Sequence, residues 1–125
     1  MALLSTPPIR LPHPGPWISV ERDIPVRMPD GVTLLTDRYS PRGVDRPPTI
    51  LVRTPYGRRG IPGLVNGLPA TFAYFGYQVV VQSTRGTFGS GGEFDPLNEG
   101  DDGLATVAWM KRQRWFGGSF ATFGA

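Results

Sequence analysis

The sequence predicts an α/β domain, in which an antiparallel hairpin leads into a parallel sheet with flanking helices. Two runs of residues, 49–53 and 77–82, are apolar and β-branched without alternation, as in strands that are buried on both faces. A segment of helical composition lies between them, at 68–75. Upstream, Asp30-Gly31 forms a turn signal between two segments of alternating polarity, which is typical of a hairpin.

The predicted hairpin has two strands, 17–27 and 32–39. Apolar side chains recur at strand spacing in both, although residues 21–23 interrupt the pattern in the first. The 16 residues before the hairpin contain five prolines. We therefore expect residues 1–16 to form an extended arm and residues 17–125 to form the domain itself.

Two helices are expected to flank the sheet. The first, 68–75, tolerates Pro69 in its first turn and is followed by Gly76, a residue type that commonly ends helices. The second, 98–112, has Asn98 as its N-cap and carries acidic residues near its positive end. The side chains of this second helix that are expected to face inward are Leu104, Val107 and Ala108.

The last apolar segment, 120–123, predicts a third buried strand that leads into two small residues, Gly124 and Ala125. In α/β hydrolases a strand ends in a sharp G-x-S-x-G elbow, which exposes a nucleophilic serine above the sheet. Gly124 and Ala125 match the first two positions of that elbow. Together with the preceding hairpin, this order of elements predicts the N-terminal, incomplete part of an α/β-hydrolase fold.

Composition argues against several classes of protein. The 125 residues contain no cysteine, which rules out disulfides and thiolate metal sites. The net charge of +3 is not gathered on one element with interleaved aromatic residues, so nucleic-acid binding is not expected. No apolar run is long enough to span a membrane, and the N-terminus lacks a signal-peptide pattern. We expect no membrane association and a cytoplasmic location.

Three features resemble functional sites but favour other interpretations. The glycine-rich segment 86–92 follows a strand, but residues 93–96 separate it from the next helix, unlike a dinucleotide-binding fingerprint. Ser119 stands in a near match to G-x-S-x-G, yet it precedes its strand and would emerge at the wrong edge of the sheet. His13 is the only histidine and lies in the arm, so no metal site is predicted. A nucleotide-binding module is the least favoured function, and no cofactor is expected.

Several short stretches between residues 24 and 125 carry a family resemblance. In order, they are Asp30-Gly31-Val32 with Leu34, Asp37, Tyr39 and Pro41; Leu51-Val52-Arg53-Thr54-Pro55-Tyr56; Gly76-Tyr77 with Val79-Val80-Val81-Gln82; Thr84-Arg85-Gly86 with Gly89-Ser90 and Gly92-Glu93-Phe94; and Asp102 with Trp109, Trp115 and Phe123-Gly124. Taken together, they resemble the X-Pro dipeptidyl-peptidase and cocaine-esterase-like (CocE/NonD) family of serine hydrolases.

The resemblance implies a serine hydrolase acting on a small-molecule ester or a short peptide. Members of the family carry Ser-Tyr-x-Gly after the elbow glycine and its neighbour, and their triad Asp and His lie further on. The chain is therefore expected to be an N-terminal fragment that ends just before the nucleophile and is inactive alone. The alternative is a non-catalytic half that needs a separately encoded C-terminal partner chain. Whether the substrate is a peptide or an ester stays open.

Tyr56 is the catalytic residue that the resemblance carries over to this chain. It follows the run 49–53 in an Arg-x-Pro-Tyr motif, where the family has a tyrosine whose hydroxyl donates to the oxyanion. Such a preorganised donor stabilises the transition state. Position alone favours a different role, in which Tyr56 plugs a loop with its hydroxyl bonded to backbone, and only the resemblance favours the oxyanion role.

Charged residues outside this motif favour structural roles. Arg85 is expected to anchor its loop, by binding carbonyl groups or by pairing with Glu93 or an acid near Asp101. Asp101 and Asp102 could form a general-base pair, but a favourable interaction with the helix dipole is preferred.

Overall fold

The computed structural model describes residues 17–58, 67–96 and 99–123. The expected arm, the N-cap Asn98 and the elbow residues Gly124 and Ala125 lie outside the described residues. None of the described helices is long and apolar enough to cross a membrane.

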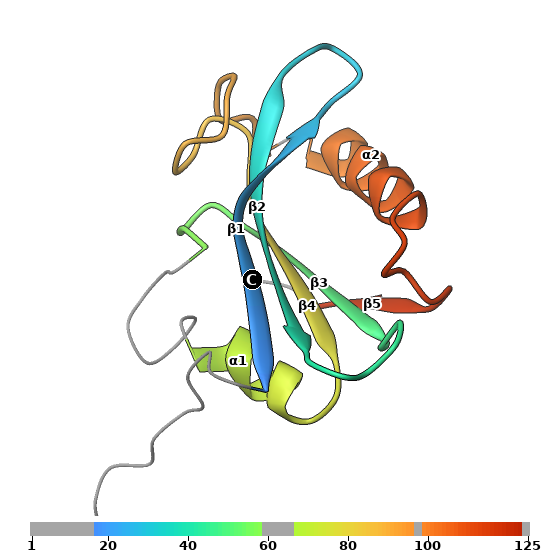
Figure 1. The fold of residues 1–125 in the computed structure, drawn as a ribbon. Helices are drawn as coiled ribbons and strands as arrows, with labels where there is room; N and C mark the ends of the chain where they lie inside the picture. Colours follow the sequence, from blue (N-terminus) through green and yellow to red (C-terminus); the bar gives the residue numbers. More distant parts are fainter. Residues whose placement is uncertain (1–16, 59–66, 97–98, 124–125) are drawn as a thin grey trace, which may run out of the picture.

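Within the part of the chain that the structure describes, five strands form one mixed sheet in the order β1-β2-β4-β3-β5 (Figure 1). β1 and β2 pair antiparallel, β2 pairs antiparallel with β4, and β3 pairs parallel with both β4 and β5. The strands are β1 (Ile18–Arg27), β2 (Thr33–Pro41), β3 (Thr49–Thr54), β4 (Gln78–Ser83) and β5 (Phe120–Thr122). This arrangement confirms the predicted α/β class, with a hairpin that leads into parallel strands.

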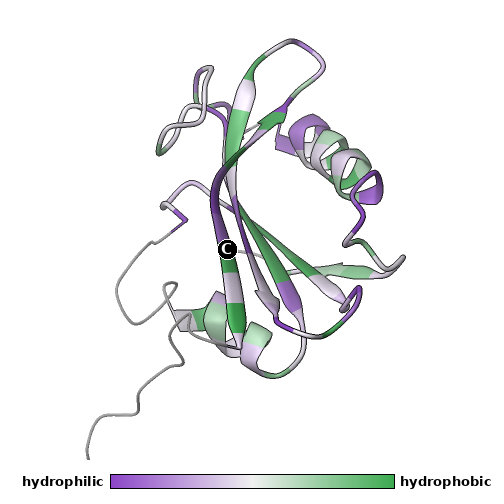
Figure 2. Ribbon diagram, in the orientation of Figure 1, coloured by the Kyte–Doolittle hydropathy of each residue, from purple (hydrophilic) through white to green (hydrophobic). Residues whose placement is uncertain are grey.

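The two described helices, α1 (Gly67–Tyr74) and α2 (Glu99–Lys111), cover opposite faces of the sheet. Successive residues of a strand point to opposite faces. Val79 and Val81 of β4 pack with residues of α1, whereas Val80 packs with Met110 of α2. Each residue of β4 is buried, as predicted for a strand that is covered on both faces, and β3 and β4 both carry hydrophobic residues along part of their length (Figure 2).

The hairpin turn forms where Asp30-Gly31 predicted it. The Met28 amide donates to the Val32 carbonyl at 2.7 Å, and the Asp30 carboxylate accepts from the Val32 amide at 3.0 Å. Gly31 has a φ of 91°, a left-handed conformation that glycine adopts without a steric cost. The interruption at residues 21–23 is a shift in the β1–β2 register between Glu21 and Ile24.

The prediction for the inward face of α2 was correct for Val107, which packs against the core cluster of Met110, and wrong for the other two residues. Leu104 is 72% exposed and Ala108 is exposed, whereas the buried residues are Asp102, Thr106 and Met110. Two of these three buried residues, Asp102 and Thr106, face inward because each has a polar partner on the side of the sheet. Asp102 pairs with Arg85 at 2.7 Å, and Thr106 Oγ1 lies 2.8 Å from Gln82 Oε1.

β5 was predicted to be buried, but its three residues are exposed. Within the described residues it pairs with β3 alone and therefore forms an edge of the sheet. The Ser119 carbonyl accepts from the Thr49 amide at the start of β3, so Ser119 lies at the amino end of the parallel strands. This location agrees with the prediction that Ser119 is not the nucleophile.

The segment between α2 and β5 is attached to the sheet through Trp115. The Gln78 side-chain amide donates to the Trp115 carbonyl at 2.7 Å, and the Arg38 guanidinium lies over the Trp115 ring at 4.9 Å from its centroid. Gln78 is fully buried in β4, so these contacts place Trp115 at a defined point beside the sheet.

Candidate active site

The carboxyl ends of β3, β4 and β5 lie at one edge of the sheet, because the three strands run parallel. Ligands of α/β proteins bind at this edge. Tyr56 follows β3 by two residues, and Phe123 follows β5 directly. Both side chains line one small pocket, together with residues of α1. The residue before the predicted elbow therefore lies beside the predicted oxyanion donor.

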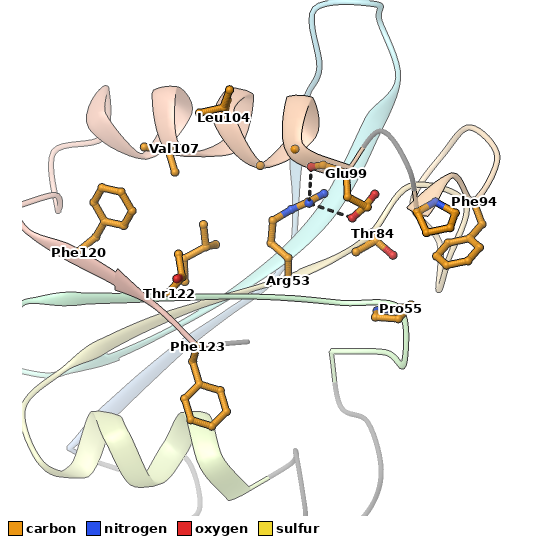
Figure 3. Close-up of a pocket in the computed structure, with 14 residues that line it drawn as sticks. Arg53, Pro55, Thr84, Phe94, Glu99, Leu104, Val107, Phe120, Thr122 and Phe123 are labelled. Carbon is orange, nitrogen blue, oxygen red and sulfur yellow. Dashed lines mark hydrogen bonds and ion pairs between the residues drawn. The ribbon is translucent and has the colours of Figure 1, made fainter. Parts of the chain in front are cut away.

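The aromatic rings of the first residue of β5 and of the residue just after β5 lie on opposite faces of the sheet. Figure 3 shows Phe120 on the side of α2 and Phe123 on the side of α1. The Phe123 ring meets the Phe72 ring of α1 edge to face, with their centroids 6.0 Å apart. This contact holds the end of β5 against α1.

The Tyr56 side chain is 58% exposed. Its backbone amide donates to Thr54 Oγ1 at 3.0 Å, and no hydrogen bond joins its hydroxyl to another described residue. Among the described residues, the backbone acceptor that a loop-plugging tyrosine would use is therefore not found.

The backbone beside Tyr56 passes under an aromatic ring. Gly57 has a φ of 94°, and a Cβ atom at this position would lie 3.1 Å from the Phe88 ring. Any side chain at Gly57 would be strained by the conformation and would also press on the ring. Phe88 belongs to the glycine-rich segment after β4, so the two loops at this edge are in contact.

Arg58 is almost completely buried, with 6% of its surface exposed, and Asp37 of β2 is 0% exposed. Arg58 Nε donates to Asp37 Oδ1 at 3.0 Å. Arg58 NH1 donates to Ser83 Oγ at 2.8 Å and to the Phe88 carbonyl at 3.0 Å, and NH2 pairs with the Asp23 carboxylate. Each nitrogen of the guanidinium thus has an acceptor.

Asp37 also binds the irregular part of β1. Its carboxylate accepts from the Asp23 amide at 2.9 Å and from Arg22 at 3.2 Å. Asp23 has a φ of 56°, in the left-handed region that non-glycine residues rarely occupy. The sequence predicted only an interruption of the strand pattern at this place. In the structure it is a bulge that packs against the buried ion pair of Arg58 and Asp37.

The sequence analysis did not predict that Arg58 and Asp37 form a pair. Asp37 lies in a strand of alternating polarity at a position that turns out to be buried, and a charge at such a position signals a partner. The partner lies 21 residues away in a loop, and spacing along the chain does not identify it.

The glycine-rich segment after β4 is closed by its own hydrogen bonds. The Gly86 amide donates to the Gly91 carbonyl at 2.8 Å, and the Gly91 amide donates to the Thr33 carbonyl at 2.8 Å. Ser90 Oγ accepts from the Leu35 amide and donates to the Ser83 carbonyl, both at 2.8 Å. A phosphate-binding loop needs free amides, and these amides are occupied.

Arg85 anchors this segment, as expected, to an acid next to Asp101. It binds Asp102 through two hydrogen bonds of 2.9 and 2.7 Å, and it also donates to Asp30 at 2.8 Å. Hydrogen bonding to the two carboxylates raises the pKa of Arg85, and the hydrogen bond from Arg85 lowers the pKa of Asp30.

A larger cavity of about 620 Å³ lies between α2 and the parallel strands (Figure 3). Its lining is mainly apolar and includes Leu104 and Val107 of α2 and Phe120 of β5. At one end, Arg53 pairs with Glu99 at 2.9 Å. Val107 points from α2 toward the strands, whereas Leu104, which is 72% exposed, borders the cavity from the outer side of the helix (Figure 3).

Comparison with known proteins identifies the family. A family model described as X-Pro dipeptidyl-peptidase (S15 family) matches residues 30–125. The chain belongs to this family. Cocaine esterase from Rhodococcus sp. (strain MB1 Bresler) is 38% identical over 111 residues, which cover 85% of this chain and 19% of the relative. The S15 chain thus spans about a fifth of the length of this curated relative.

Solved structures of related hydrolases share the fold of the S15 chain. A CocE/NonD family hydrolase from Staphylococcus aureus superposes with a TM-score of 0.74 at 20% identity, over 94% of this chain and 28% of that one. An aminopeptidase from a marine sediment archaeon, Thaumarchaeota archaeon, gives a TM-score of 0.69 at 27% identity, over 95% and 23% of the two chains. The predicted fold class and family are confirmed, and the family is one of serine hydrolases.

Proposed function

We propose that this chain forms the first part of the catalytic domain of a serine hydrolase that cleaves acyl esters or X-Pro dipeptidyl peptides, with Tyr56 as an oxyanion donor. The observation that carries the proposal is the position of Tyr56. Its exposed side chain shares a pocket with Phe123, which immediately precedes the elbow residue Gly124.

In the proposed reaction, a serine after Ala125 attacks the carbonyl carbon of the substrate. A histidine takes the serine proton and passes it to the leaving alcohol or amine, and water then hydrolyses the acyl-enzyme. Negative charge develops on the carbonyl oxygen in each step. The Tyr56 hydroxyl and the backbone amide after the serine would donate hydrogen bonds to that oxygen.

The names of the relatives support both substrate classes. They include a cocaine esterase, an α-amino acid ester hydrolase and an aminopeptidase. Esters and amides pass through the same kind of tetrahedral intermediate, so the role of Tyr56 is the same for both. A panel with one acyl ester and one X-Pro p-nitroanilide distinguishes the two substrate classes.

The test of this function is Tyr56→Phe in the full-length hydrolase that contains this chain. Loss of one oxyanion donor is expected to lower kcat about 100-fold or more, with little change in KM. Tyr74→Phe is the matched control, because Tyr74 is also 58% exposed but ends α1, and it should leave kcat unchanged. A kcat unaffected by Tyr56→Phe would exclude the proposed role.

A second candidate function is a half-enzyme that pairs with a separately encoded C-terminal chain. The exposed edge formed by β5 favours it, because an unpaired strand is a template for another chain. Neither the 125-residue chain nor its partner alone should then be labelled by a fluorophosphonate. A mixture of the two should be labelled and should regain esterase activity. Labelling of the 125-residue chain alone would contradict both candidates.

A further inference from the structure

The loop that carries Tyr56 is fixed to the domain at two points. Directly before Gly57, the Tyr56 amide is bound to Thr54 Oγ1 of β3. Directly after Gly57, the Arg58 side chain is buried among its acceptors. The residue between these two points has the Phe88 ring against its backbone. Little freedom remains for the backbone of Tyr56.

The acceptors of Arg58 come from separate segments of the chain. They are Asp23 in the bulge of β1, Asp37 in β2, Ser83 at the end of β4 and the carbonyl of Phe88 in the following loop. A guanidinium has a planar fork of donors, so four acceptors in different directions define its orientation. The orientation of Arg58 in turn defines where the preceding two residues lie.

A buried ion pair is by itself weak evidence for a role in stability. Well-packed apolar side chains often stabilise a protein as much as a buried ion pair of similar volume, because desolvation of the charges is costly. An apolar cluster, however, lacks the directional contacts that hold one loop geometry. Catalytic donors need such fixed geometry, since a small misplacement of the reacting groups lowers the rate strongly.

We propose that Arg58 is a positioning residue for the oxyanion site. Through its contacts with Asp37, Ser83 and Phe88, it holds the Tyr56 hydroxyl at the place where the oxyanion develops. This inference rests on the function proposed above. Arg58 itself does not touch the substrate, since its side chain is buried under the loop and each of its nitrogens is bound.

A double-mutant cycle in the full-length hydrolase tests this inference. The variants are Tyr56→Phe, Arg58→Gln and the double variant, and kcat is expressed per active site labelled by a fluorophosphonate. Arg58→Gln is expected to lower kcat about 10- to 100-fold, with KM changed by less than about threefold. The double variant should be no slower than Tyr56→Phe alone, because both changes remove the same interaction.

Two further variants separate positioning from folding. Arg58→Lys keeps a charge beside Asp37 but loses the fork, so its kcat should lie between those of the wild type and Arg58→Gln. Arg38→Gln is the matched control, since Arg38 also donates to a carboxylate, that of Glu21, and to a side chain of β4, that of Gln78, but has no contact with the described part of the Tyr56 loop. It should keep kcat per labelled site within about twofold, and its effect should add to that of Tyr56→Phe.

The outcomes distinguish the inference from the function on which it rests. If Tyr56→Phe has no effect on kcat, the oxyanion role is wrong and the role of Arg58 falls with it. Suppose that Tyr56→Phe lowers kcat, but that the effects of the two substitutions on kcat are additive or that Arg58→Gln changes KM alone. Only the positioning role is then overturned. If Arg58→Gln yields no labelled enzyme, Ser83→Ala removes one acceptor of Arg58 NH1 and enters the same cycle with the same criteria.

Discussion

The side chain of Arg85 joins three segments that are distant in sequence. It extends from the loop after β4, binds both carboxylate oxygens of Asp102 in α2, and reaches Asp30 in the hairpin turn. Arg85 and Asp102 are largely buried, whereas Asp30 is exposed. The Asp102 pair is bidentate and shielded, so it contributes more to the free energy of unfolding than the solvated Asp30 pair.

The Asp30 pair makes stability depend on pH in a defined direction. The hydrogen bond from Arg85 lowers the pKa of Asp30 below 3.8, so its contribution is present above pH 3.8 and is lost as the pH falls through the folded-state pKa. Asp30→Asn should therefore lower Tm at neutral pH, and the difference from the wild type should shrink below pH 3.8.

Thermal unfolding of the wild type and Asp30→Asn, followed between neutral pH and about pH 2.5, checks this expectation. Asparagine retains the oxygen that accepts from the Val32 amide, so the turn itself is kept. Asp45→Asn, in the exposed loop between β2 and β3, is the control. A Tm difference that is constant down to the lowest pH would contradict the assignment.

At the residue scale, the roles of single residues were easier to predict from the sequence than the pairs that they form. The sequence suggested that Arg85 pairs with an acid near Asp101, and the structure confirms Asp102 but adds Asp30 from the hairpin. The pairing of Arg58 with Asp37 was not predicted. Long-range pairs depend on how the sheet brings segments together, and local sequence carries no signal for that.

Elements with local signals formed as predicted. The hairpin follows from Asp30-Gly31, and α1 ends just before Gly76, which has a φ of 98°. The inward face of α2 was mispredicted at Leu104 and Ala108, because hydrophobicity was the only guide. Asp102 and Thr106 lie inward because β4 and its loop offer polar partners, and Leu104 turns outward as a result.

The corrected orientation of α2 predicts which of its apolar residues stabilises the domain. Met110 is fully buried against Leu51 and Val80, so Met110→Ala should lower the free energy of unfolding by about 2–5 kcal/mol. Leu104→Ala should cost well under about 1 kcal/mol, because Leu104 is 72% exposed. Urea denaturation of the two variants compares them directly, and a larger loss for Leu104→Ala would contradict the observed face.

The sheet as a whole is asymmetric. On one side it ends in a long hairpin, and on the other it ends in the short strand β5, which carries exposed aromatic side chains at Phe120 and nearby Phe123. The cavity between α2 and the strands opens beside this second edge. Unpaired backbone groups and apolar surface together promote association.

The 125-residue chain produced alone is therefore expected to associate through β5. Sedimentation velocity should show species larger than the monomer, and thermal unfolding should be broad. Ala121→Lys adds a charge in the middle of β5 and should reduce association, because charged residues on an edge strand disfavour pairing. A monomeric wild-type chain with a sharp, cooperative transition would contradict this expectation.

The attachment of Trp115 bears on how β5 finds its place. A strand of three residues with a single neighbour gains little free energy from its own pairing. Trp115 is bound to Gln78 and Arg38, and only four residues separate it from the start of β5. A short closure has a small entropic cost. Trp115, which lies outside both strands, therefore limits the positions at which β5 can pair with β3, through its backbone carbonyl as well as its ring.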